Sequence, residues 1–131
     1  MTFVDSSYWI AQVLPRSRRH EVAKELESTH AAGRLITSNA VLGETWTYLR
    51  NKRGHAPAIQ WLDQVKHSQT SIERIDAELE DDAWSWLRVH DERPYSFVDA
   101  TSFALMRKLR IREALAFDGN FAAAGFVELR P

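Results

Sequence analysis

The sequence contains no cysteine, so it can form neither a disulfide nor a thiolate metal site. It also lacks any apolar run close to the ~20 residues that a membrane-spanning helix needs. Its first twenty residues carry an acid at position 5 and basic residues after the apolar part, which is the reverse of a secretory signal peptide. We therefore expect a cytoplasmic protein with no membrane segment.

A strong charge of either sign is lacking as well. The net charge of −1 argues against broad, non-specific binding of nucleic acid. The basic residues nevertheless gather in three clusters, at 15–20, 50–55 and 107–112. Each cluster alone is typical of a solvated helix end, whereas clusters that converge on one rim would indicate a surface for an anionic polymer.

The composition is that of one globular domain. The chain has 131 residues, of which 44% are hydrophobic and 27% are charged. Five tryptophans are enough to anchor a core and leave some for an interface. No linker, repeat or low-complexity segment interrupts the chain, so we expect a single domain over residues 1–131.

Short apolar runs alternate with segments of helical period, which predicts an α/β fold with a mainly parallel sheet. The expected strands cover 2–5, 34–37, 70–75, 113–118 and 126–129. The expected helices cover 6–14, 19–33, 39–53, 56–68, 76–92, a segment that starts at 96, and a short turn at 120–125. Gly33 and Gly54 are expected to end helices, and 113–118 is apolar enough for the middle of a sheet.

Four acids from distant parts of the chain fall where strands end and helices begin. Asp5 ends the first strand, Asp118 ends the strand 113–118, and Asp99 lies in the first turn of a helix. Glu44 lies in the second turn of the helix after 34–37. Ligands of open α/β sheets bind at this edge, so the topology predicts that the four carboxylates converge.

Each acid also has a simpler interpretation. The stretch "SFVD" fits a capping box in which Asp99 only stabilises its helix. Asp5 can cap the helix that follows it, Glu44 can be a solvated helix residue, and Asp118 before a glycine is typical of a turn. Taken one at a time these interpretations stay open, but all four must hold together if no shared site exists.

Carboxylates so close together repel one another, and a divalent cation removes that conflict. Mg²⁺ and Mn²⁺ prefer oxygen ligands, and Mg²⁺ usually keeps several waters with one or two direct carboxylates. A cation of this kind lowers the pKa of a bound water and offsets charge on a phosphate, while a further carboxylate orients the water. The predicted chemistry is metal-assisted hydrolysis of a phosphodiester.

Four stretches, "FVDSSYW", "TSNAVLGETWTYL", "YSFVDATSFALMRK" and "LAFDGNF", resemble the acidic motifs of PIN-domain ribonucleases, in the order in which that family uses them. The small size, with nothing added, resembles the VapC toxins of bacterial toxin–antitoxin pairs. The resemblance spans nearly the whole chain. It implies a three-layer α/β/α sandwich with a mainly parallel central sheet, formed by one PIN domain over residues 1–131.

The resemblance also implies roles for individual residues. Asp5, Glu44, Asp99 and Asp118 correspond to the catalytic acids. Asp5, Asp99 and Asp118 form the metal site, with Asp5 and Asp99 as direct ligands of Mg²⁺, for which Mn²⁺ can substitute. The supporting residues are Ser6, Asn39, Ser96 and Asn120. Asn120 stands where many relatives have a further Asp; its carbonyl can still ligate or hold a water, but it brings no charge.

The implied substrate is a structured RNA loop, in large-subunit ribosomal RNA or in tRNA, and the wording of the motifs is closest to the ribosomal branch. The expected partners are a VapB-type antitoxin and a second copy of the chain, with the helix of Trp84 and Trp86 as part of the dimer surface. Candidate RNA contacts are Arg50, Lys52, Arg53, Arg107 and Lys108, together with Tyr48. Trp46 fits either an RNA contact or the core.

Two other functions remain open at this point. A Mg²⁺-dependent phosphatase or phosphotransferase could use Asp5 as its nucleophile, but such sites carry a second acid two residues on, where this chain has Ser7. A non-catalytic binding module could keep the fold with a site left incomplete at Asn120, although the four retained acids argue against this.

Overall fold

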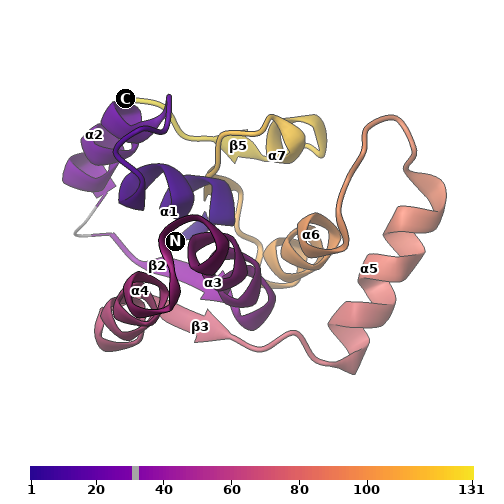
Figure 1. Cartoon of the computed structure of the whole chain (residues 1–131). Coiled ribbons are helices and arrows are strands. Elements are labelled where there is room, and N and C mark those ends of the chain that lie inside the picture. The colour runs from indigo at the N-terminus through magenta and orange to yellow at the C-terminus, as the bar shows by residue number, and fades with distance from the viewer. Residues whose placement is uncertain (31–32) are drawn as a thin grey trace.

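The computed structural model describes residues 1–30 and 33–131, which form five strands and seven helices (Figure 1). The strands are β1 (Thr2–Val4), β2 (Leu35–Ser38), β3 (Ser71–Glu73), β4 (Glu113–Leu115) and β5 (Val127–Glu128). The helices are α1 (Ser6–Val13), α2 (His20–His30), α3 (Asn39–Arg53), α4 (His55–His67), α5 (Ala77–Val89), α6 (Phe97–Leu109) and α7 (Asn120–Ala123).

All neighbouring strands are parallel, and their order in the sheet is β3-β2-β1-β4-β5. The chain moves outward from β1 to β3 and then returns to β4 on the other side of β1. Right-handed crossovers place the helices of these two excursions on opposite faces of the sheet. The predicted three-layer α/β/α sandwich is confirmed, and the order reverses next to β1, where ligands of such sheets bind.

The middle of the sheet is buried because it is covered on both faces. All three residues of β1 are buried, and Phe3 lies opposite Ile36 of β2 and Ala114 of β4. Phe3 stacks on Phe121 of α7 with 6.0 Å between ring centroids. This packing joins the first strand to the short helix that follows β4, and so fixes the relative positions of the acids at their ends.

Helix α6 is buried along most of its length. Every residue from Asp99 to Met106 is buried. The two hydroxyls in its middle are satisfied within the helix, because Thr101 Oγ1 and Ser102 Oγ both donate to the Val98 carbonyl, at 2.7 and 2.9 Å. A helix covered on all sides explains why apolar residues in this stretch are not confined to one face.

Four strands are shorter than the sequence predicts: the strand predicted over 2–5 ends at Val4, and the one predicted over 70–75 contains only Ser71–Glu73. The strand predicted over 113–118 ends at Leu115, whose carbonyl accepts from Asp5 N at 3.0 Å. Beyond it, Phe117 N donates to the side chain of Ser7 instead of to a neighbouring strand. The strand predicted over 126–129 likewise contains only Val127–Glu128. Asp118 therefore stands on a loop three residues past β4.

The helix predicted over 19–33 runs from His20 to His30, and its expected continuation through 31–32 lies outside the described residues. Gly54 separates α3 from α4 with a φ of 98°, a conformation that favours glycine, so its predicted role is confirmed. Across the two described ranges, no helix combines the length and apolarity that crossing a membrane requires.

Candidate active site

Asp5 lies at the end of the central strand β1 and is the N-cap of α1. Its side chain is buried, with 2% of the residue exposed. The oxygen Oδ2 accepts from Ser7 N at 3.1 Å and from Ser7 Oγ at 2.7 Å. The other oxygen, Oδ1, is buried and has no hydrogen-bond partner among the described residues. Ser7 thus fixes the carboxylate by one oxygen and leaves the other available to a ligand.

The environment of Asp5 disfavours its charged form. Burial, together with the charges of Asp118 and Asp99, raises the pKa of Asp5 from 3.8 to about 7, although the bonds from Ser7 oppose the shift. At neutral pH a substantial fraction of Asp5 therefore holds a proton when no cation is near. A cation beside Oδ1 would displace that proton.

Asp99 fills both roles that the sequence left open. Ser96 Oγ accepts from Asp99 N at 2.9 Å, and Asp99 Oδ2 accepts from Ser96 N at 3.0 Å, so the capping box is formed. The same oxygen accepts from Asn120 Nδ2 at 3.1 Å. Burial raises the pKa of Asp99, and the charge of Glu44 adds to the increase. Capping and membership of the acidic cluster coexist in one carboxylate.

Asp118 and Asn120 stand on the loop between β4 and α7. Gly119 adopts a φ of 81°, and Asp118 Oδ1 accepts from Asn120 N at 3.0 Å, which makes a tight turn. Asp118 is exposed at the rim of the site. Partial burial raises the pKa of Asp118, and the charges of Asp99 and Glu128 act in the same direction. The predicted turn is formed, and Asp118 lies close enough to Asp5 and Asp99 for its charge to act on theirs.

Glu44 joins the cluster from α3. Ser6 Oγ donates to Glu44 Oε1, which ties the first turn of α1 to the second turn of α3. Asp5, and not Ser6, is the N-cap of α1, which leaves the Ser6 hydroxyl free to bind Glu44. Asn39 lines the same hollow as Glu44, but its side-chain oxygen is engaged elsewhere: it accepts from Ile75 N at 2.7 Å and holds the segment between β3 and α5.

The donor set suits a hydrated divalent cation. The acids are close enough to shift one another's pKa, and the unpartnered Oδ1 of Asp5 is an acceptor that only a cation or a donor could satisfy. Over residues 1–30 and 33–131, however, no three acidic or histidine side chains are placed to ligate one ion together. An ion bound directly to one or two carboxylates, and to the rest through water, fits this spacing.

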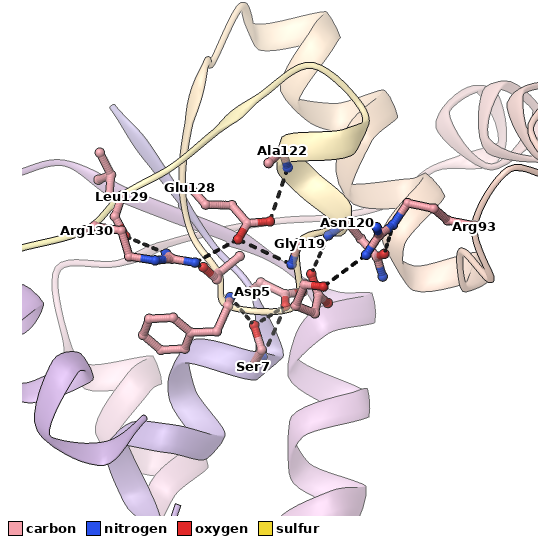
Figure 2. Close-up of polar contacts among 12 residues, drawn as sticks. Asp5, Ser7, Arg93, Gly119, Asn120, Ala122, Glu128, Leu129 and Arg130 are labelled. Atoms are coloured by element: carbon pink, nitrogen blue, oxygen red, sulfur yellow. Dashed lines mark hydrogen bonds and ion pairs between the residues drawn. The ribbon is translucent and has the colours of Figure 1, made fainter. Parts of the chain in front are cut away.

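Hydrogen bonds to Glu128 hold the Asp118 loop in place, and they were not predicted from the sequence (Figure 2). The Glu128 carboxylate of β5 accepts from Gly119 N at 3.3 Å and from Ala122 N at 3.1 Å, and Arg130 Nη2 pairs with it at 3.0 Å. The Glu128 side chain is only 5% exposed. The signal available in the sequence was the acid Glu128 inside an otherwise apolar stretch that predicts a strand. Ser7 was missed as well, because its contact with Phe117 joins segments far apart in the sequence.

The predicted RNA contacts divide into two groups. Lys52 and Arg53 line a surface hollow with Arg16, and this hollow shares Ile10 and Tyr48 with a second hollow that contains Glu44. We call the two together the α1–α3 groove; it is lined by Ile10, Leu14, Arg16, Ser17, Asn39, Ala40, Gly43, Glu44, Thr47, Tyr48, Asn51, Lys52, Arg53 and Val98. Arg50 shares the last turns of α3 but does not line the groove.

Arg107 and Lys108 stand in the last turn of α6, about 12 Å along the helix axis from Asp99 at ~1.5 Å per residue. Lys52 and Arg53 stand equally far along α3 from Glu44, but their hollow adjoins the one that contains Glu44, whereas Arg107 and Lys108 line neither hollow. Tyr48 is 40% exposed, whereas Trp46 is half-buried against the core, which favours the core interpretation of Trp46.

The comparison with protein families matches residues 2–127 to the PIN domain. The chain therefore belongs to the PIN-domain family, whose nucleases use a divalent metal ion.

Two relatives are identical to the chain at 50% of positions over 131 residues, which is 100% of this chain and 99% of each relative. Both are the 23S rRNA-specific endonuclease VapC20 of Mycobacterium tuberculosis, from strains CDC 1551 / Oshkosh and ATCC 25618 / H37Rv. The crystal structure of M. tuberculosis VapC20, described as a sarcin–ricin loop cleaving toxin, matches with a TM-score of 0.95 at 50% identity and covers 100% of both chains.

This similarity makes the chain an endonuclease of the VapC kind. The two alternatives drawn from the sequence, a phosphatase that uses Asp5 and a non-catalytic module, have no counterpart among these full-length relatives.

Proposed function

We propose that this chain is a Mg²⁺-dependent endoribonuclease toxin that cuts the sarcin–ricin loop of 23S ribosomal RNA. The observation that supports the proposal is that Asp5, Glu44, Asp99 and Asp118, which come from four separate segments, lie close enough for their charges to act on one another. The choice of RNA is supported by the full-length identity to relatives named for this substrate. The tRNA alternative has no comparable support.

Asp5 and Asp99 are the residues that would hold the cation, with Asp118 contributing through water at the rim. When bound, Mg²⁺ or Mn²⁺ supplies charge that offsets the phosphate and lowers the pKa of a water. Asp5 can hold the ion through Oδ1 because Ser7 occupies only Oδ2. Asp99 is held in place by its capping box and so needs no rearrangement to take part.

Glu44 is the carboxylate best placed to handle the attacking water. It is exposed to solvent, and the Ser6 hydroxyl fixes its Oε1, which leaves Oε2 to orient the water or accept its proton. The water oxygen bonds to phosphorus as one ester bond to a ribose oxygen breaks, and that leaving oxygen takes up a proton. The products are two RNA ends, one with a phosphate and one with a hydroxyl.

The α1–α3 groove is the proposed path of the RNA. It runs from Glu44 to Arg16, Lys52 and Arg53, so an anionic strand that enters the acids can leave along positive charge. Tyr48 lies where the two hollows meet, and an unstacked base can stack on its ring. Arg107 and Lys108, which the sequence also suggested, would contact more distant parts of the RNA.

The proposal includes two protein partners and a location in the cytoplasm, where ribosomes lie. A VapB-type antitoxin would cover the acids and block the RNA. A homodimer would use the outer face of α5, where Trp84 is 45% exposed and stacks on Phe97 at 4.5 Å between centroids. Light scattering of a Trp84→Glu variant tests the dimer: a monomer is expected, and an unchanged dimer would move the interface elsewhere.

The function is tested by incubating the purified protein with bacterial ribosomes or with total tRNA, in Mg²⁺ or in EDTA, and mapping the new RNA ends. We expect one cut in the sarcin–ricin loop, in Mg²⁺ only, and none with Asp99→Asn. Cleavage confined to tRNA would replace the substrate. Absence of any metal-dependent cleavage would contradict the proposed function itself.

A further inference from the structure

Arg93 lies beside the acidic cluster, and the mechanism above does not use it. It belongs to the segment between α5 and α6, and its side chain reaches the Asp118 loop (Figure 2). Its Nε donates to Asn120 Oδ1 at 2.9 Å, and its Nη2 donates to the Asp118 carbonyl at 3.3 Å. One guanidinium thus joins the segment between α5 and α6 to the loop between β4 and α7.

These contacts determine how Asn120 is oriented. A guanidinium only donates hydrogen bonds and an ionised carboxylate only accepts them, so the Asn120 carbonyl must face Arg93 and its amide nitrogen must face Asp99. The carbonyl is therefore engaged, contrary to the expectation that it could ligate a metal. Asn120 instead bridges Arg93 and Asp99, with its oxygen bonded to the first and its nitrogen to the second.

Arg93 retains capacity for an anion. Its contacts inside the protein are a neutral amide and a backbone carbonyl, and within the described residues it forms no ion pair with any carboxylate. The residue is exposed to solvent. Gly119 gives it room, since a Cβ at that position would meet Arg93 Nη2 at 3.2 Å. A full positive charge with free donors thus stands at the edge of a cluster of carboxylates.

We propose that Arg93 is a further catalytic residue, which binds a non-bridging oxygen of the scissile phosphate. This rests on the proposed function. Carboxylates alone repel the RNA backbone, and a bidentate guanidinium is well suited to phosphate oxygens. Charge builds on those oxygens in the transition state, so a donor already fixed at the site stabilises it more than the bound substrate. The contacts to Asn120 and Asp118 fix the guanidinium in advance.

The simpler interpretation is that Arg93 only ties the Asp118 loop to the start of α6. The two interpretations differ in what happens to RNA binding without metal. A phosphate contact contributes to the dependence of affinity on salt, at ~0.7 in the logarithmic slope per contact with single-stranded RNA. A tether inside the protein contributes nothing to that slope.

The experiment compares wild type, Arg93→Gln, Arg93→Lys and the control Arg88→Gln, which removes an exposed arginine from α5. Cleavage of ribosomes is measured in Mg²⁺. Binding of a hairpin RNA with the sarcin–ricin loop sequence is measured in EDTA between low and moderate salt. The melting temperature of each variant is recorded with and without Mn²⁺.

We expect Arg93→Gln to lose roughly 10²-fold in cleavage rate, the scale of one donor aimed at developing charge. Its salt slope should fall by about 0.7, while the stabilisation by Mn²⁺ persists. Arg93→Lys should recover part of the cleavage, and Arg88→Gln should match wild type.

Cleavage by Arg93→Gln within threefold of wild type would overturn the role of Arg93. A loss of cleavage with an unchanged salt slope and no recovery in Arg93→Lys would also overturn it, in favour of the tether. If wild type itself cuts no ribosomal RNA, the proposed function has failed, which these controls distinguish from a failure of Arg93 alone.

Discussion

Ser7 binds a single oxygen of Asp5 twice, through its backbone N–H at 3.1 Å and its hydroxyl at 2.7 Å. The same hydroxyl accepts from Phe117 N at 3.0 Å, so it also joins the ends of β1 and β4. One small side chain thus orients the most buried acid of the site and holds together the two strands that bear the site.

Replacing Ser7 by alanine should destabilise the metal-free protein by about 1–3 kcal/mol, because Phe117 N loses its partner. It should also weaken Mn²⁺ binding, since the hydroxyl of Ser7 lowers the pKa of Asp5 and its loss favours the protonated acid. Urea unfolding and a Mn²⁺ titration measure the two effects. Ser85→Ala, at an exposed position of α5, should change stability by less than ~0.5 kcal/mol. Equal behaviour of the two variants would count against the role of Ser7.

Asp99→Asn should remove cleavage and spare the fold. Ser96 N and Asn120 Nδ2 both donate to the same oxygen, Oδ2, and an asparagine carbonyl placed there accepts both bonds. The buried charge disappears, so the metal-free protein should be as stable as wild type or more stable. Cleavage should fall on the order of 10³-fold, with the stabilisation by Mn²⁺ largely lost.

The matched control for this substitution is Asp76→Asn, since Asp76 is the N-cap of α5 outside the site. It should cost at most about 1 kcal/mol and leave cleavage unchanged. A destabilised but fully active Asp99→Asn protein would show that Asp99 serves only as a cap.

The stability of the metal-free protein should fall as pH rises from about 4 to about 7. Burial raises the pKa of Asp5 to about 7 from 3.8 when unfolded, so in this interval the native state binds more protons than the unfolded state. The free energy of unfolding then decreases with pH and levels off above pH 7. Asp5→Asn should flatten this part of the profile. A wild-type profile that rises across the interval would be inconsistent with a protonated Asp5.

Metal binding should show the opposite dependence on pH. A cation requires the ionised carboxylate, so the increase in melting temperature caused by Mn²⁺ should grow as pH rises through the pKa of Asp5, about 7. Differential scanning fluorimetry at several pH values measures this. An increase in melting temperature that is the same at pH 6 and pH 8 would exclude Asp5 as a direct ligand.

Charge reversal should have different effects at the two basic clusters, Lys52 with Arg53 and Arg107 with Lys108. Lys52→Glu with Arg53→Glu should raise KM for RNA and lower the salt slope by ~1.4, for two contacts. Arg107→Glu with Lys108→Glu should have a smaller effect, because those two residues do not line the α1–α3 groove. Equal effects of the two double variants would exclude the α1–α3 groove as the main path.

Tyr48→Ala should reduce RNA affinity about tenfold, the lower end of the ~1–3 kcal/mol that stacking on one base contributes. Tyr48→Phe keeps the ring and should bind like wild type. A filter-binding measurement in EDTA compares them without cleavage. If both variants lose affinity equally, the hydroxyl and not the ring would contact the RNA.

The fold and the positions of the four acids in it could be predicted because both follow from local sequence patterns. Apolar runs alternating with helical segments specify parallel strands, and the acid after such a run is placed at one sheet edge by topology alone. Asp5 and Asp118 satisfy that rule. The predicted capping box at Ser96 and Asp99 also depends on residues only three positions apart, and it is formed.

The remaining parts of the site depend on contacts across long sequence separations. Ser7 meets Phe117, Arg93 meets Asn120, and Glu128 meets the Asp118 loop; no periodicity or motif records these pairs. The length of β4 was overestimated for the same reason, since its pairing ends where a side chain from α1 takes the next backbone donor. The residues that form a helix cap lie close together in the sequence, whereas the end of a strand depends on the chain that lies beside it in the structure.

Asp99 Oδ2 accepts hydrogen bonds from both Ser96 and Asn120, and this has an evolutionary consequence. A change to asparagine removes the charge that the proposed mechanism needs but keeps both hydrogen bonds that Asp99 Oδ2 accepts. Selection against a harmful activity can therefore produce an inactive but fully folded descendant by a single substitution. Such a descendant would still present the surface that a neutralising partner binds, and could act as a decoy that sequesters it from active copies.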